Sequence, residues 1–198
     1  MTFPLTLEIG EQGLDDLLAG RRPDDAEGLP EGLESIMGEL QAAPCELEMA
    51  RGRRSGYGWV GARLAALVVP AGEQWMLHLV PVEFVPDALA RLNGLGPRPE
   101  GQMASPVRYD PALLAQAVAT GEHELAQGLR EHWRVEAVWP SGPERVSRRA
   151  VEVLDTQDGL WLVTPVEGQV ELAHVRPTEV FRRLCGLLPA PSELLAGR

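Results

Sequence analysis

The sequence predicts an α+β protein with a central, twisted antiparallel sheet that is built from two quasi-equivalent helix–strands–helix halves and flanked by helical bundles. Three observations support this fold class. A pattern of strand, turn, strand and helix occurs twice, at residues 67–99 and again at 162–191. The turns inside the pattern are short, which favours antiparallel pairing, because a parallel crossover needs about a dozen residues or more. Both helices run into the same x-Gly-Leu-x-Pro-x-Pro segment, as a duplicated unit would.

The elements of the first half, about residues 30–99, follow from hydrophobic periodicity and turn residues. After a strand or helix approach at 4–11 and a short helix at 14–18, Leu33, Met37 and Leu40 recur at helical spacing before Pro44. Leu47 and Met49 then alternate with glutamates, as in a half-buried strand. We expect a hairpin loop at 51–58, strands at 59–69 and 74–82, and a helix at 87–95 that Pro97 ends.

The second half, about residues 110–191, is expected to repeat this order within a single domain over 1–198. Asp110 and Pro111 are typical of a helix start. The apolar face of that long helix would hold Leu113, Leu114, Ala117, Val118, Leu125 and Leu129. Strands are expected at 133–139, 146–155, 160–166 and 169–175, a helix that Pro189 ends at 178–188, and a tail at 191–198.

Charge and composition exclude several classes of function. The formal charge of −11 argues against nucleic acid as a partner, because phosphate binding needs concentrated positive charge. Two cysteines, Cys45 and Cys185, do not make a disulfide scaffold, so a reducing compartment is expected. No signal peptide is visible, and no apolar run approaches the roughly 20 residues that span a bilayer. We therefore expect a soluble, cytoplasmic protein that is not inserted in a membrane.

A glycine-rich segment, Gly56-Tyr57-Gly58-Trp59-Val60-Gly61, fits the letters of the dinucleotide fingerprint. That fingerprint holds a pyrophosphate where a glycine turn delivers a strand into the N-terminus of a helix. Here the residues that follow favour a strand, so a flexible hairpin tip is the preferred interpretation. An enzyme that binds a nucleotide or another small molecule at this loop remains the alternative.

The histidines and aspartates do not form a metal site in the sequence. His123-Glu124-Leu125-Ala126-Gln127 resembles the zinc protease helix motif, but Gln127 stands where the second histidine ligand must be. His78 and His174 lie in predicted strands and are expected to be structural. Asp155 and Asp158 are explained by a turn between strands. We therefore expect no metal, no cofactor and no catalytic residue.

Five residues combine arginine with aromatic side chains: Arg51, Arg53, Arg54, Tyr57 and Trp59. This combination is typical of binding hot spots and also of platforms for single-stranded nucleic acid. On an acidic chain a protein partner is the better functional interpretation. Arg53, Arg54, Tyr57 and Trp59 are therefore the candidate partner-binding residues. The alternative is a solvated hairpin with Trp59 folded back into the core.

The order of elements and several segments resemble the EspG family, the cytosolic chaperones of type VII (ESX) secretion. A first helix followed by Ala43-Pro44-Cys45-Glu46-Leu47-Glu48-Met49, and then an apolar hairpin into Leu79-Val80-Pro81-Val82, is similar to the first half of that family. The segment from Arg148 to Thr156, with Gly159-Leu160-Trp161-Leu162-Val163 after it, is similar to the second half. The resemblance covers about residues 28–190.

This resemblance implies a protein without catalysis that binds the helical tip of a PE–PPE heterodimer before export. By analogy, the contacts would come from the hairpin loop of the first half and from a C-terminal helical bundle. The chain is short, with little helix between 110 and 133, so the second bundle should be small. A generic dimerising adaptor is a further alternative, and the oligomeric state is open, a homodimer included. A concave polar pocket near 56–61 would favour an enzyme, and a broad exposed apolar patch would favour a chaperone.

Overall fold

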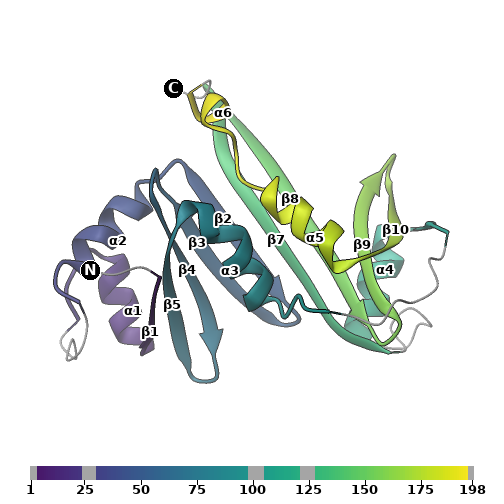
Figure 1. Cartoon of the computed structure of the whole chain (residues 1–198), viewed down its shortest axis with the longest axis horizontal. Coiled ribbons are helices and arrows are strands. Elements are labelled where there is room, and N and C mark those ends of the chain that lie inside the picture. The colour runs from purple at the N-terminus through teal and green to yellow at the C-terminus, as the bar shows by residue number, and fades with distance from the viewer. Residues whose placement is uncertain (1–3, 24–29, 98–104, 121–127, 196–198) are drawn as a thin grey trace.

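A computed structural model describes residues 4–23, 30–97, 105–120 and 128–195, and it has the predicted α+β fold (Figure 1). Within these residues, ten antiparallel strands form one sheet in the order β1-β5-β4-β3-β2-β7-β8-β9-β10-β6. The strands are β1 (Leu5–Ile9), β2 (Cys45–Arg51), β3 (Arg54–Val60), β4 (Leu64–Ala71), β5 (Gln74–Pro81), β6 (Val107–Tyr109), β7 (Leu129–Gly142), β8 (Arg145–Thr156), β9 (Gly159–Val166) and β10 (Gln169–Val175). The helices are α1 (Glu11–Leu18), α2 (Leu33–Gln41), the 3-10 turn η1 (Val82–Phe84), α3 (Val85–Leu92), α4 (Pro111–Thr120), α5 (Pro177–Cys185) and α6 (Pro191–Leu195).

The two halves of the chain meet where β2 pairs with β7. On one side of this pair the order is β2, β3, β4, β5, and on the other it is β7, β8, β9, β10, with β1 and β6 as the edge strands. Helices α2 and α4 precede the strands of their halves, and α3 and α5 follow them. Figure 1 shows the strand direction rotating from β5 across to β9, as in a twisted sheet. This order supports the proposal that residues 30–99 and 110–191 are copies of one unit within a single domain.

The first face of the sheet, face A, packs against α3 and α5. It carries the alternate strand residues that include Leu47, Met49 and Trp133, which are buried together with Leu89 of α3 and Leu184 of α5. Both halves supply residues to this core, and Figure 1 shows α3 and α5 lying over the central strands. Each helix can pack in this way because its buried apolar residues recur about one helical turn apart and therefore lie on one side.

The opposite face, face B, is covered at its two ends. At one end α1 and α2 pack on β4 and β5, where Leu17 and Met37 are buried with Val68 and Leu77. At the other end Leu114 of α4 is buried against β8, β9 and β10. Between these ends, no helix of the described residues packs on β2 and β7, so the middle of face B is open.

Two predicted boundaries in the first half are wrong. The expected hairpin loop at 51–58 is mostly strand, because β3 begins at Arg54 and the hairpin turn is reduced to Gly52 and Arg53. The expected strand at 59–69 is two strands, since β3 ends at Val60 and β4 begins at Leu64. The expected strand at 45–49 is confirmed, with Leu47 and Met49 buried.

The helices of the second half also differ from the prediction. The described part of the long helix is α4, Pro111–Thr120, and Leu125 lies outside the described residues. Leu113 is exposed, and Leu129 begins β7. The predicted tail contains helix α6. Helices α3 and α5 end before the glycine of the repeated segment rather than at its proline, and Gly94 takes a left-handed φ of 61°.

Candidate functional site

The β2–β3 hairpin divides the predicted arginine and aromatic cluster between the two faces of the sheet. Arg51 and Arg54 face each other as the last pair of the hairpin. Because side chains alternate along a strand, Arg54 shares face A with the buried Val60, whereas Tyr57 and Trp59 lie on face B. The candidate residues therefore do not share one face of the hairpin.

On face A a hollow of about 590 Å³ opens beneath the arginines, between the tips of two hairpins. The pairing of β3 with β4 ends at Tyr57 and Val68, so the tip of β2–β3 separates from the tip of β4–β5. Pro70 of β4 has no amide hydrogen with which to extend that ladder. We call this hollow the arginine hollow. Its lining residues are Met49, Arg51, Arg53, Arg54, Gly56, Val69, Pro70, Ala71, Met76, His78, Leu92, Asn93 and Glu131.

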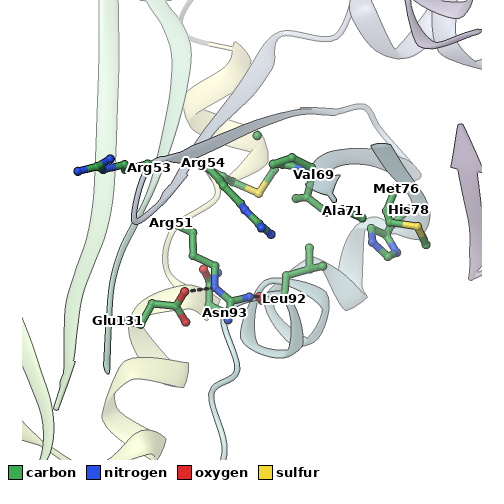
Figure 2. Close-up of a pocket in the computed structure, with 13 residues that line it drawn as sticks. Arg51, Arg53, Arg54, Val69, Ala71, Met76, His78, Leu92, Asn93 and Glu131 are labelled. Carbon is green, nitrogen blue, oxygen red and sulfur yellow. Dashed lines mark hydrogen bonds and ion pairs between the residues drawn. The ribbon is translucent and has the colours of Figure 1, made fainter. Parts of the chain in front are cut away.

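Arg51 is held at the floor of the arginine hollow by two contacts (Figure 2). Its Nε donates to Glu131 Oε1 at 2.5 Å, and its Nη1 donates to the backbone oxygen of Leu92 at 2.5 Å. The hydrogen bond to Glu131 raises the pKa of Arg51 above its ordinary value, and burial lowers that pKa by a smaller amount. The cation also satisfies a carbonyl at the C-terminus of α3, where positive charge is favourable.

Arg54 and Arg53 are different, because neither side chain has a hydrogen bond or an ion pair within the described part of the chain. Figure 2 shows Arg54 pointing into the space between Arg51, Val69 and Leu92, whereas Arg53 points away from it. Arg54 is therefore the unpaired cation of the arginine hollow.

A histidine and an asparagine complete the polar part of this hollow. His78 of β5 shares a hydrogen bond of 3.0 Å with the hydroxyl of Thr6, and burial lowers its pKa. Asn93 is buried and donates from Nδ2 to the backbone oxygen of Leu89 at 2.8 Å. His78 therefore has the structural role predicted from its strand position, and it also faces the hollow.

On face B a second hollow, of about 470 Å³, lies on the other side of the same hairpin. Its polar lining is mainly acidic. Glu46 and Glu48 of β2 have no ion pair among the described residues, whereas Glu136 of β7 is paired with Arg134 at 2.8 Å. We call it the acidic hollow. Its lining residues are Glu46, Leu47, Glu48, Met49, Ala50, Ser55, Gly56, Tyr57, Gly58, Trp59, Arg134 and Glu136.

The aromatic side chains of the acidic hollow are also part of the protein interior. Tyr57 lies edge-on to Trp59, with ring centroids 5.6 Å apart, and 5.7 Å from Trp75. All three pack against the core under α1 and α2. Burial, with a smaller effect of Asp15, raises the pKa of Tyr57. The alternative in which Trp59 folds back toward the core is thus partly correct, since each ring is half-buried.

The first two glycines of the fingerprint-like segment allow β3 and β4 to pack closely. A Cβ on Gly56 would lie 2.6 Å from the oxygen of Val68, and one on Gly58 would lie 2.6 Å from that of Ala66. No side chain fits at such distances. The segment is a strand that continues into β4 rather than a turn into a helix, so the expected flexible tip and the alternative of a pyrophosphate site on these glycines are both wrong.

The other residues considered from the sequence do not converge on a site. His174 is buried and lies edge-on to Trp161, and Asp155 is buried in β8. His123 and Glu124 lie outside the described residues. Across the ranges that the structure describes, no three His, Cys, Asp or Glu side chains are arranged to hold a metal ion. None of the helices described has the length and hydrophobicity of a membrane span.

A third hollow, of about 490 Å³, lies beneath α6 and is almost entirely apolar. Cys45 borders it, and burial raises the pKa of that thiol to about 11; Cys45 and Cys185 are both free. Arg149 holds α6 in place, because it donates to Glu193 at 2.6 Å and to the oxygen of Leu188 at 3.0 Å. Sequence reasoning missed this hollow, because its walls come from the two halves of the chain.

The expected broad apolar patch is not found in the described part of the chain. The large apolar side chains that are strongly exposed there are Phe84, Val107, Leu113 and Val146, which belong to four different elements. The patch named as the sign of a chaperone is therefore not found there, whereas two hollows with polar groups border Gly56, the place named for an enzyme pocket.

Comparison with solved structures shows that the fold is EspG-like. A solved structure that matches is the Mycobacterium tuberculosis type VII secretion system chaperone EspG5 in complex with the PE25-PPE41 dimer, with a TM-score of 0.61 and 12% sequence identity. The match covers 93% of this chain and 97% of that one. No protein-family model and no curated protein matches the sequence.

Proposed function

We propose that this protein belongs to the EspG family and is a non-enzymatic, cytosolic chaperone that binds the helical tip of PE–PPE-like heterodimers for type VII secretion. The observation that carries the proposal is the EspG-like fold over 93% of the chain. The segments that resemble the family, 43–49 and 148–163, lie in strand β2 and in strands β8 and β9 of the sheet.

The β2–β3 hairpin is the proposed contact region, with Arg53 and Arg54 on its tip and Tyr57 and Trp59 on face B. Its two hollows combine apolar walls with unpaired charges, which suits a partner that must be bound and later released. Interfaces of this kind join a few buried anchors to a polar, salt-sensitive rim. Helix α4 at the far end of face B would supply the part of the second helical bundle that lies in the described residues.

Co-expression with each co-encoded PE–PPE-like pair tests the proposal. The pair should co-purify with the tagged protein and co-elute from size-exclusion chromatography as a complex of defined mass, and it should be less aggregated than the pair expressed alone. The matched control is an unrelated four-helix protein expressed in the same way. If every co-encoded pair fails to associate while the purified protein is a stable homodimer, the adaptor alternative replaces the chaperone function.

A further inference from the structure

The arginine hollow has the properties of a site for a single carboxylate with apolar neighbours. Its walls include Met49, Val69, Met76 and Leu92, which are buried or half-buried and accept apolar side chains. Its volume of about 590 Å³ lies within the range of pockets that hold small ligands or a few side chains. The hollow is therefore large enough for one acidic residue and the apolar residues next to it.

The charges of this hollow do not cancel. Glu131 is the acidic residue in the lining, and it is already bonded to Arg51. Arg54 then remains as a guanidinium that points inward and has no partner in the described residues. A guanidinium presents its donors in a planar fork, which matches the two oxygens of a carboxylate. This positive charge is confined to the hollow, since the chain as a whole carries a formal charge of −11. The protein would therefore repel a polyanion, and a single carboxylate fits the hollow better.

We infer that the arginine hollow receives an aspartate or glutamate side chain from the protein partner, flanked by apolar residues of that partner, and that Arg54 binds the carboxylate. This inference rests on the proposed function and adds the chemistry of the contact. Arg51 forms the floor of the site, where Glu131 and the backbone oxygen of Leu92 hold it in place. Tyr57 and Trp59 lie on the opposite face and do not contribute to this contact.

Charge reversal at two arginines, one inside the hollow and one outside it, tests the inference with a captured PE–PPE-like pair. Arg54→Glu should weaken capture by at least about thirtyfold, the loss expected for a true anchor, and a partner variant with arginine in place of the interfacial acid should restore it. The control is Arg145→Glu, which makes the same change of charge at an exposed position of β8 outside the hollow and should weaken capture by less than about threefold. Equal effects of the two variants, or full capture by Arg54→Glu, would overturn the inference and leave the chaperone function standing.

A second measurement does not depend on any partner. Two probe peptides, acetyl-Leu-Glu-Leu-amide and acetyl-Leu-Gln-Leu-amide, are titrated into the whole protein up to millimolar concentration. The NMR signal of the Arg54 side-chain Nε–H should shift and saturate with the glutamate peptide only. In the Arg54→Lys variant, the signals of the other residues that line the hollow should lose most of the shift that this peptide causes in the wild type. If the two peptides give equal shifts, or neither gives one, the carboxylate site is wrong, whatever the pull-down shows.

Discussion

The two faces of the β2–β3 hairpin differ in what their side chains already contact. On face A, Arg54 points into a hollow and has no partner in the described residues. On face B, the ring of Tyr57 lies against those of Trp59 and Trp75, and all three pack against the core under α1 and α2. Residues only three positions apart thus differ in what they contact, because successive side chains of a strand point to opposite faces.

This difference teaches that composition alone does not define a binding surface. Arginine and aromatic residues together suggested one hot spot, yet the aromatics contribute to stability while Arg54 is available for a partner. A double substitution of Arg54 and Tyr57 would therefore mix two effects, and these residues need separate tests. Four sets of variants separate the two faces, beginning with the change that should damage both.

The largest effect is expected for Gly58→Val, which should disturb the packing of β3 and therefore both faces of the hairpin. The new side chain would begin 2.6 Å from the oxygen of Ala66, so β3 and β4 must move apart. We expect a loss of about 3 kcal/mol in the free energy of unfolding, measured by urea titration with circular dichroism. In contrast, Gly38→Ala in α2, where a Cβ would meet no atom within 4 Å, should gain about 0.5–1 kcal/mol. A Gly58→Val protein as stable as the wild type would refute the packing described for β3.

The next effect compares the two faces directly, through the stability lost when one side chain on each face is removed. Tyr57→Ala should lower the free energy of unfolding by about 2 kcal/mol, because it removes a half-buried ring and two aromatic contacts. Arg54→Ala should change it by no more than about 0.5 kcal/mol, as expected for a side chain without partners. Differential scanning calorimetry of the two variants measures both values. Equal losses would mean that the faces do not differ in structural role.

A smaller effect is expected within the arginine hollow itself. Arg51→Ala should cost about 1 kcal/mol of stability, since it leaves Glu131 and the oxygen of Leu92 without their shared donor in a half-exposed position. Arg53→Ala, at the turn beside it, serves as the control and should be neutral. Thermal unfolding of both variants at low and high salt checks the result, and the cost of Arg51→Ala should shrink as salt screens the pair.

The smallest effect is a pH dependence on face A. Burial lowers the pKa of His78, so the folded protein binds a proton at this site less readily than the unfolded chain. Stability should therefore be complete above the ordinary histidine pKa of about 6.5 and should decrease as the pH falls below it. Urea titrations at pH 7.5 and 5.5 should show a smaller decrease for His78→Gln than for the wild type. An identical pH dependence in the variant would exclude His78 as the cause.

Much of the sheet could be predicted from the sequence, because apolar and polar residues alternate clearly in β2 and in the strands of the second half. Strand β3 could not. Its arginine, serine and glycines are typical of a loop, and the pairing with β2 and β4 overrides that local preference. Helix α4 shows the same limit, since Leu113 was predicted to lie on its apolar face, yet the helix buries Leu114 and Ala117 and leaves Leu113 exposed.

The candidate site was predictable only in part. Arg53 and Arg54 were found from composition, and they do lie at the hairpin tip. The walls of the arginine hollow, such as Met76, Leu92 and Glu131, come from β5, α3 and β7, and a single sequence carries no signal that brings these elements together. Pro70 was one available sign, because it directly follows the predicted strand at 59–69 and a proline has no amide hydrogen to donate to a neighbouring strand.

The shared core of face A has a consequence for how the chain is made. Leu47 and Leu89 of the first half are buried together with Trp133, Val153 and Leu184 of the second. On the ribosome the first half emerges earlier, and at synthesis rates of about 5–20 residues per second it waits several seconds for the residues that complete its core. During that interval its apolar surface is open to solvent and to other nascent chains. A protein proposed to shield apolar surfaces therefore passes through a stage in which its own must be protected.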